Sequence, residues 1–370
     1  MSSCSFRAAV GHLALLIVLT LAGCGEVLME PAARRGPLNA SIAPGSITTT
    51  VLATPVGVPL TAEAVSEEGT IFGRGSGTLP QALYAWNPYS AQPIVVDADG
   101  MVNGGGSNDL GDVLGWKANG PDGAWLKTGP SSWSFVATPM AGFKDASPGE
   151  INNAREMAIT VALPGYAGFD AWRGAYMPAP GATPVVLPLP GTLSNSWAVA
   201  LNNAGDIAGY AYETVGSGKN ATTLQRPVFW RRTGPATWTA ELLPNPAPTQ
   251  SGSARAVNDA GQVAGIAGYS VVRWSPSGSS WTIATFATTG GSAPRIDACG
   301  RMAGTTGSGA YVWDGTLTTL PWPSGAQSTG AADIGRDSAS GLGVVVGAAE
   351  VGKGRHTTRM PVRWTIPACP

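Results

Sequence analysis

The chain repeats one short phrase with variations. In its clearest copy, at 200–209, a small and an apolar residue precede Asn202, Gly205 follows at the fourth turn position, and Gly209 closes the phrase after an apolar and a small residue. Clear relatives occupy 256–265 and 295–304; the copy near 152 lacks both glycines and the last copy carries an insertion. An internal period of about 40–50 residues is typical of four-stranded propeller blades. The anchors of the copies lie 36 to 56 residues apart, at Ser66, Asn108, Asn152, Asn202, Asn258, Asp297 and Asp333.

Each part of the phrase has a physical meaning. Asn or Asp at the first position and Gly at the fourth are typical of a type I turn, because the short side chain bonds to nearby backbone and Gly tolerates the exit geometry. The apolar residues on either side then belong to two paired strands. The closing Gly fits a place where backbones approach closely, as near the central channel of a propeller. The best-defined turn pairs are Asn108 and Gly111, Asn202 and Gly205, Asn258 and Gly261, and Asp297 and Gly300.

Alternating aliphatic and aromatic runs follow each phrase and predict a third and a fourth strand. Tryptophans seven or eight residues apart flank a Gly/Pro/Ser turn in three copies, so we expect them to be cross-strand partners. These pairs are Trp125 and Trp133, Trp230 and Trp238, and Trp274 and Trp281. We assign most of the 13 tryptophans to blade packing and keep Trp116, Trp172 and Trp197 as candidate ligand-binding residues.

Seven copies predict an all-β propeller, most simply of seven four-stranded antiparallel blades over residues 47–370, with six or eight blades as alternatives. The last copy leaves little chain for a fourth strand, whereas an isolated β-rich run precedes the first copy at 47–54. We therefore expect the N-terminal strand to complete the last blade and close the ring, which removes exposed sheet edges.

The Asn-x-x-Gly-x-Val-x-Gly phrase and the later aliphatic-aromatic-Trp strand resemble the HAF-repeat family of bacterial extracellular proteins, over about residues 60 to 364. The His-Ala-Phe tripeptide of that family is missing, and its place is held by the segments at 227–229, 310–312 and 361–363. The chain is therefore similar to a divergent member. The resemblance implies a propeller outside the cytoplasm and no established catalytic residue.

The N-terminus predicts export. Arg7 supplies a positive charge, and the apolar run at 13–20 is too short to span a bilayer. The sequence Leu21-Ala22-Gly23-Cys24 resembles the bacterial lipobox, which implies a signal peptide at 1–23 and lipidation of Cys24. A plain signal peptide is the alternative. Residues 24–46 then form a flexible Pro/Ala/Gly-rich tether. Glu26 in place of Asp at the second mature position favours the outer membrane or cell surface.

Cysteine content and charge narrow the possible partners. Cys4 would leave with the signal peptide, so Cys299 and Cys369 remain either as a disulfide or as two free thiols. No CxxC motif or histidine cluster accompanies them to suggest zinc. The formal net charge is −1, or −2 without Arg7, which speaks against nucleic-acid binding.

Motifs for chemistry are scarce. His356 is the one histidine of the predicted mature chain, and no Gly-x-Ser-x-Gly motif occurs. Alternating oxygen ligands at Asp97, Asp99 and Asn103 make a weak calcium candidate, but the segment also matches a blade turn, which we favour. No cofactor is indicated.

Three functional hypotheses follow. The first is a monomeric, lipid-anchored module without catalytic activity. It would bind a protein or glycan partner through loops such as 212–225 and 335–343. The second is a carbohydrate-active enzyme with carboxylates at the propeller channel. The third is a structural component of the cell envelope. The inner-hairpin carboxylates that the second hypothesis would use are Glu67, Glu68, Asp109, Asp112, Asp206, Asp259 and Asp297.

Overall fold

A computed structural model describes residues 46–369, except 76–80, 88–91, 139–141, 166–171, 192, 288–291, 293 and 353–356. These residues belong to the compact unit Asn39–Pro370. Cys24, nearly all of the expected tether and His356 lie outside the described residues. Within the described part of the chain, no helix is long and apolar enough to cross a membrane.

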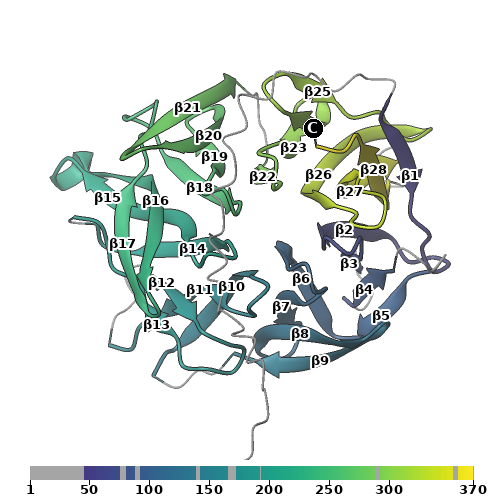
Figure 1. Cartoon of the computed structure of the whole chain (residues 1–370), viewed down its shortest axis with the longest axis horizontal. Coiled ribbons are helices and arrows are strands. Elements are labelled where there is room, and N and C mark those ends of the chain that lie inside the picture. Colours follow the sequence, from purple (N-terminus) through teal and green to yellow (C-terminus); the bar gives the residue numbers. More distant parts are fainter. Residues whose placement is uncertain are drawn as a thin grey trace, which may run out of the picture. The chain divides into compact units, whose positions relative to one another are not determined.

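The described residues form seven four-stranded antiparallel sheets, arranged as blades of a ring (Figure 1). The prediction of a seven-bladed propeller is thereby confirmed. Blade 1 contains β2 (Leu60–Val65), β3 (Ile71–Gly75), β4 (Leu83–Trp86) and β5 (Ile94–Asp97). Blade 2 contains β6 (Gly100–Ser107), β7 (Val113–Lys117), β8 (Asp122–Gly129) and β9 (Ser132–Ala137). Blade 3 contains β10 (Asp145–Ile151), β11 (Met157–Ala162), β12 (Trp172–Met177) and β13 (Val185–Val186).

Blade 4 contains β14 (Ser196–Leu201), β15 (Ile207–Val215), β16 (Thr222–Gly234) and β17 (Thr237–Leu242), with a short 3-10 helix, η3 (Gly218–Asn220), in its hairpin. Blade 5 contains β18 (Gly252–Val257), β19 (Val263–Ala267), β20 (Ser270–Ser277) and β21 (Ser280–Ala287). Blade 6 contains β22 (Arg295–Ile296), β23 (Met302–Thr306), β24 (Gly309–Trp313) and β25 (Leu317–Thr319). Blade 7 contains β26 (Ala326–Arg336), β27 (Gly343–Val351), β28 (Thr358–Ile366) and β1 (Thr48–Val51).

The ring closes through the two ends of the domain. Strand β1 pairs with β28 from Thr48 opposite Thr365 to Val51 opposite Val362. The N-terminal run therefore supplies the outer strand of the last blade, as the sequence predicts. Closure leaves no blade short of a strand.

In five blades a tryptophan of the third strand fastens the blade to the chain that enters it. The indole N–H of Trp230 donates to the Pro188 carbonyl at 2.7 Å, and Trp274 donates to Pro244 at 2.7 Å. Both rings are fully buried. Because a buried N–H needs an acceptor, each ring both fills the core and fixes a connection. Trp86, Trp125 and Trp364 make equivalent bonds to Ala53, Asp97 and Pro321.

The expected direct pairing of the hairpin tryptophans is wrong. Trp230 lies opposite Ala240, and Trp238 lies opposite Arg232. The turn lies much nearer the second tryptophan, so the two rings are displaced by two positions. The second ring contacts the preceding blade instead, with Trp238 4.6 Å from Tyr176 between ring centroids. The other hairpins are displaced in the same way, and Trp133 and Trp281 contact Phe72 and Phe229 of the preceding blade.

A β-bulge in the inner strand explains the closing glycine. In blade 4 the register shifts between Ala198 and Ala200, which pushes the inner strand toward its neighbour. A Cβ at Gly209 would lie 1.9 Å from the Trp197 carbonyl oxygen and 3.1 Å from the ring of Trp230. A side chain therefore has no room here. Gly73, Gly115, Gly265 and Gly347 are equally crowded against the inner-strand carbonyls of Thr61, Met101, Ser253 and Gly330.

The repeated turns form as expected and also bond to one another. Gly205 donates its N–H to the Asn202 carbonyl and has φ +83°, a conformation that favours glycine. The Asn202 side-chain oxygen accepts the Asp206 N–H, while its amide donates to the Asn258 carbonyl of the next blade at 3.1 Å. In the third copy Arg155 occupies the glycine position with φ 62°. The same bond to the next blade is made by Asn108, Asn152 and Asn258.

These four bonds join blades 2 to 6, which we call the ladder arc. Blades 7 and 1, with their junctions to blades 6 and 2, form the closure arc. In the closure arc the seventh turn is anchored by Asp337, whose carbonyl accepts the Gly341 N–H. The prediction of Asp333 as this anchor is wrong. The hairpin of β26 and β27 continues past the usual turn position, so Asp333 lies within the strand opposite Val346.

Candidate functional site

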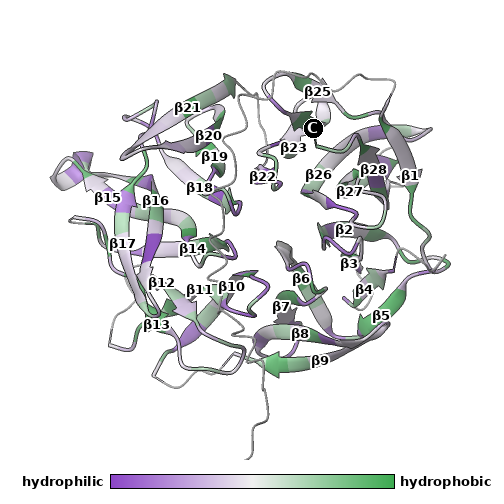
Figure 2. Ribbon diagram, in the orientation of Figure 1, coloured by the Kyte–Doolittle hydropathy of each residue, from purple (hydrophilic) through white to green (hydrophobic). Residues whose placement is uncertain are grey.

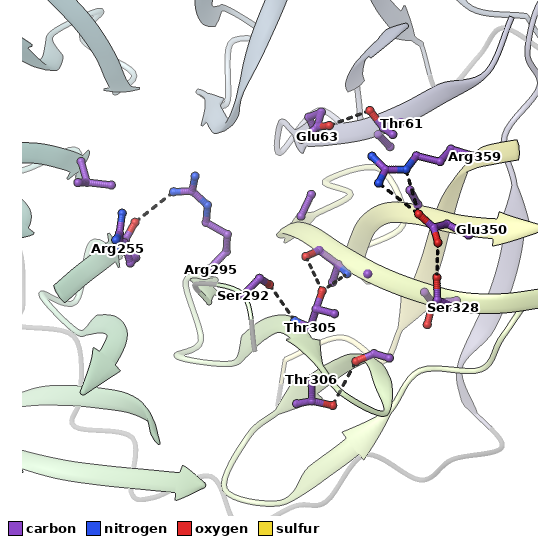
Figure 3. Close-up of a pocket in the computed structure, with 18 of the residues that line it drawn as sticks. Thr61, Glu63, Arg255, Ser292, Arg295, Thr305, Thr306, Ser328, Glu350 and Arg359 are labelled. Atoms are coloured by element: carbon purple, nitrogen blue, oxygen red, sulfur yellow. Dashed lines mark hydrogen bonds and ion pairs between the residues drawn. The ribbon is translucent and has the colours of Figure 1, made fainter. Parts of the chain in front are cut away.

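Two cavities lie along the centre of the ring. The wide cavity, of about 740 Å³, is lined mainly by the first halves of the inner strands (Figure 3). The narrow cavity, of about 160 Å³, is lined by the last residues of the same strands and by the repeated turns. Arg295 lines both. Figure 2 shows hydrophilic residues in purple at the tips around the centre of the ring, beside β10, β14 and β18.

In five blades a bulge of the inner strand directs a residue toward the wide cavity. A bulge leaves its extra residue without a direct partner on the neighbouring strand and re-aims the side chain. In blade 5 this residue is Arg255, between Ala254 and Ala256, and in blade 1 it is Glu63. Both line the wide cavity, as do the bulge residues Gly149, Val199 and Ala332.

The next position along the inner strands forms a second layer. Four blades have a small residue there, three of them Ala64, Ala200 and Ala256. Blades 3, 6 and 7 have Glu150, Arg295 and Asp333 at this position, opposite Ala158, Ala303 and Val346. Three charged residues therefore project from a layer of the channel in which the repeat otherwise places alanine or glycine.

The two carboxyl groups of this layer resist ionisation. Burial raises the pKa of Glu150 to about 8, although the guanidinium of Arg295 and the N–H of Leu201 act in the opposite direction. Burial likewise raises the pKa of Asp333 to about 6, against the effects of Arg295 and the N–H of Val65. Each carboxyl accepts that N–H from the adjacent blade, at 2.9 Å for Glu150 and 3.0 Å for Asp333. At neutral pH Glu150 is mostly protonated and Asp333 mostly ionised.

One wall of the wide cavity consists of layered aromatic rings and a guanidinium group. The Trp197 ring lies 5.7 Å from Tyr210 at an angle of 5° and 6.1 Å from Trp172. The guanidinium of Arg255 lies 4.8 Å above the Tyr210 ring. Blades 3, 4 and 5 each contribute to this stack. A cation over an aromatic face is held in place while its outer edge stays available for a ligand.

The carboxylates of the wide cavity are engaged by other protein groups. Glu63 binds Arg74 at 3.2 Å and accepts the hydroxyl of Thr61 at 2.7 Å. Glu350 binds Arg359 at 3.2 Å and accepts the hydroxyl of Ser328 at 3.1 Å. Figure 3 shows Arg255 beside Arg295 on one side of the cavity and Glu350 with Arg359 on another. The cavity therefore has a cationic side and a side on which charges are paired.

The three candidate tryptophans are only partly brought together. Trp197 lines the wide cavity and Trp172 packs against it. Trp116 lies on β7 in blade 2, opposite Met101 and Asp122, and does not line either cavity. The three tryptophans lie on different strands of their blades: Trp197 is on the first strand, Trp116 on the second and Trp172 on the third.

The inner-hairpin carboxylates have several environments. Glu67, Asp109, Asp259 and Asp297 line the narrow cavity. Burial and the charge of Asp109 raise the pKa of Glu67. Others are occupied elsewhere: Glu68 pairs with Lys127, Asp112 with Arg155, and Asp206 accepts the N–H of Arg232. The expected ring of carboxylates is thus confined to part of the narrow mouth.

The weak calcium candidate is occupied by protein contacts. Asp97 binds Lys117 at 2.9 Å and accepts the indole N–H of Trp125 and the backbone N–H of Asp99. These bonds hold the turn between blades 1 and 2. The side chain of Asn103 lies outside the described residues.

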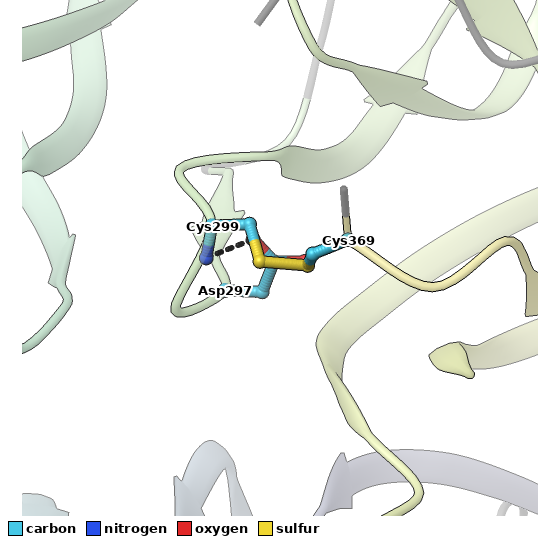
Figure 4. Close-up of side chains that lie close together, drawn as sticks. All are labelled: Asp297, Cys299 and Cys369. Atoms are coloured by element: carbon cyan, nitrogen blue, oxygen red, sulfur yellow. Dashed lines mark hydrogen bonds between the residues drawn. A yellow bond between two sulfur atoms is a disulfide. The ribbon is translucent and has the colours of Figure 1, made fainter. Parts of the chain in front are cut away.

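Cys299 and Cys369 form a disulfide, the pairing considered from the sequence (Figure 4). It joins the turn of blade 6 to the chain that follows blade 7. The carboxylate of Asp297 lies close by, within 4.8 Å of both sulfur atoms. Because the sulfurs are bonded to each other, neither is a thiolate ligand in this state.

Sequence reasoning missed Arg255, Arg295, Glu150 and Asp333 as channel residues. A usable signal exists for two of them. When the copies are aligned on their turns, Glu150 and Arg295 stand where other copies have alanine, and a charged residue in a small-residue position deserves a functional interpretation. The longer seventh hairpin hides Asp333 from this alignment, and the bulge that exposes Arg255 has no sequence marker.

No family model matches the chain, and no curated protein matches it by sequence. Solved structures do resemble it. YCF48 bound to a D1 peptide has a TM-score of 0.48 at 11% identity, over 88% of this chain and 97% of that chain. The β-propeller domain of Cps50 (Swd1) from Myceliophteria thermophila has a TM-score of 0.46 at 14% identity, over 86% and 98%. A putative gluconolactonase has a TM-score of 0.39 at 13% identity, over 89% and 96%. At such identities the likeness concerns the β-propeller fold alone.

Proposed function

We propose that this chain is a lipid-anchored, extracytoplasmic β-propeller that binds a protein or glycan partner in its wide cavity without transforming it. The observation that carries the proposal is the contrast within that cavity. Arg255, Tyr210 and Trp197 form a ready binding wall, whereas Glu63 and Glu350 are engaged in ion pairs. A cavity of about 740 Å³ falls within the size range of ligand sites.

The pairing of the carboxylates favours binding over catalysis. Glycoside hydrolysis requires one carboxyl group that donates a proton and a second that acts as base or nucleophile. Glu63 and Glu350 each bind an arginine and accept a hydroxyl hydrogen bond, so both carboxylates serve to hold neighbouring side chains in place. A partner is therefore expected to leave the cavity unchanged.

The anchor and cell location follow from the lipobox resemblance at 21–24 and the HAF-like repeat. Metabolic labelling with a clickable fatty acid tests the anchor: the parent chain should be labelled and found in the membrane fraction, and Cys24→Ala should be neither. An unlabelled parent chain would contradict lipidation and leave a secreted or periplasmic protein.

A binding screen tests the module itself. The full-length chain, in non-ionic detergent, is applied to a glycan array and used to capture envelope proteins after cross-linking. Specific binding should be lost in Trp197→Ala and in Val199→Trp, which places a bulky ring at the bulge position of the wide cavity. Trp116→Ala, outside both cavities, is the matched control. Binding that survives both cavity variants would contradict the assigned site, and turnover of a bound glycan would favour the carbohydrate-active alternative.

A further inference from the structure

We infer that Arg255 is the anion-binding residue of the wide cavity, and that its ligand is a carboxylated glycan, a chain containing uronic acid residues. The inference rests on the proposed function and adds the chemical class of the ligand. It begins with the bulge of β18, which turns Arg255 out of the strand pairing and toward the cavity.

The guanidinium of Arg255 has a fixed position and a free charge. Its Nε donates to the Ser253 hydroxyl at 2.9 Å, and its plane lies over the Tyr210 ring. Within the described part of the chain no carboxylate lies within ion-pair distance of it, whereas Arg359 of the same cavity is paired with Glu350. A preordered fork of N–H donors without a protein carboxylate matches a bidentate carboxylate of a ligand.

Arg295 strengthens this cationic side. Its Nη1 donates to the backbone carbonyl of Arg255 at 3.1 Å, so the two residues are held side by side. Of the carboxyl groups that act on Arg295, Glu150 is mostly protonated at neutral pH. Asp333, which is mostly ionised, offsets the charge of Arg295. The net positive charge on this side is therefore that of Arg255, and it attracts an anion.

The remainder of the lining matches a sugar better than an acidic peptide. Hydroxyl side chains and glycines alternate along one side, and Ser292, whose Oγ accepts the N–H of Thr305, keeps its own proton for a ligand. Sugar hydroxyls, which both donate and accept, pair with such groups. Trp322, 44% exposed at the rim, and the Trp197 stack supply the aromatic surface that sugar rings contact.

Matched uronides test the inference. Isothermal titration calorimetry with the full-length chain in non-ionic detergent uses tetramers of galacturonate, mannuronate and glucuronate, each as the free acid and as its methyl ester, up to about 1 mM. Hexaglutamate serves as the acidic peptide. We expect at least one free uronide to bind, with about tenfold or greater weakening for its ester and for Arg255→Ala and Arg255→Gln. Arg255→Lys should lose less because the charge remains.

Arg231→Ala is the matched control, because this exposed arginine of blade 4 pairs with Glu241 away from the cavity. Thermal unfolding of each variant shows whether the fold is intact. Equal binding of ester and acid, unchanged binding by Arg255→Gln, binding of hexaglutamate alone, or no uronide binding would each overturn the inference. The proposed function still stands if a neutral glycan or a protein binds and Val199→Trp abolishes that binding; it fails as well if nothing binds in the cavity.

Discussion

The same asparagine bond occurs at all four junctions between blades 2 and 6. The three junctions that join blades 6, 7, 1 and 2 lack it, and each of them uses a different bond. In the ladder arc a buried asparagine amide donates to the carbonyl of the next turn at 2.9 to 3.2 Å. In the closure arc the junctions use the Cys299–Cys369 disulfide, the Asp333 carboxylate on the Val65 N–H, and the Glu68–Lys127 ion pair. The anchors there are Ser66, Asp297 and Asp337, none of which has an amide donor.

The repeat phrase therefore encodes a junction between neighbouring blades as well as a turn. The side chain of an asparagine anchor supplies an acceptor for its own turn and a donor for the neighbouring blade, and among the anchors only the four asparagines make both bonds. Where the anchor changes, the turn persists but the junction must be made by other groups. The covalent bond is found at a junction that lacks the asparagine donor.

The largest effect is expected from opening the closure arc. Cys299→Ser should lower the free energy of unfolding by about 4 kcal/mol, because the disulfide closes a loop between residues 70 positions apart. Denaturant unfolding measures this. Cys369→Ser and the double variant should match it, since all three remove one bond, and reductant should bring the parent chain to the same value. A parent chain insensitive to both changes would contradict a stabilising disulfide.

Breaking one bond of the ladder arc should lower the free energy of unfolding by less than loss of the disulfide does. Asn202→Asp keeps the oxygen that accepts the Asp206 N–H but replaces the donor with a carboxylate oxygen facing the Asn258 carbonyl. With Asn202 only 4% exposed, we expect a loss of about 2–3 kcal/mol at neutral pH. Asn220→Asp, exposed in the blade 4 hairpin, is the control and should change stability by less than about 0.5 kcal/mol. Equal effects at both sites would show that the ladder contributes nothing.

The pH dependence of stability allows the two arcs to be compared through their channel carboxyl groups, Glu150 and Asp333. Each has a raised pKa in the folded chain, so the folded state keeps a proton that the unfolded state has released, and stability falls as pH rises through that interval. For Glu150 of the ladder arc the interval runs from 4.5 to about 8, and for Asp333 of the closure arc from 3.8 to about 6.

Glu150→Gln should therefore gain about 1–3 kcal/mol relative to the parent chain between pH 5 and 8, less than the full pKa difference implies, because Glu150 is only partly buried. Asp333→Asn should gain a smaller amount, complete by about pH 6. Unfolding free energies measured across this pH range give the two curves. A difference between variant and parent that does not change with pH, or that grows as the pH falls, would contradict the assignment of the two pKa values.

The smallest expected effect is a gain. The Oγ of Ser66 is buried without a hydrogen-bond partner among the described residues, at the position where the ladder arc has asparagine. Ser66→Asn supplies the missing donor and should stabilise the chain by about 1 kcal/mol if it extends the ladder to blade 2. Ser66→Ala separates this from simple removal of the hydroxyl. Unfolding measurements in which alanine equals or exceeds asparagine would show that the junction cannot accept the ladder bond.

The sequence predicts the fold much better than the site. Turn residues such as Asn202 and Gly205 act locally, within a few bonds, so their pattern specifies the blade and its number of copies. The closing strand is also predictable, because the last copy lacks one strand and the chain supplies one elsewhere. The register of the tryptophan hairpins follows from the turn residues, which stand directly before the second tryptophan, as Gly129 to Ser132 stand before Trp133.

The cavity residues depend on geometry that the pattern does not carry. Arg255 reaches the wide cavity through a bulge whose residues look like ordinary strand sequence. The two tryptophans Trp116 and Trp197 differ in a simpler way. Trp197 lies before its turn, on the first strand β14, and lines the cavity, whereas Trp116 lies after its turn, on the second strand β7, and does not.

The pairing of β1 with β28 makes both ends of the domain necessary for its last blade. A chain emerging from its N-terminus can complete blades 1 to 6 one after another, but blade 7 stays incomplete until the final residues arrive and find a strand that was made first. For a protein that is exported as proposed, this order delays the closed, rigid ring until translocation is over. Passage through a narrow secretion channel and final folding would then not compete.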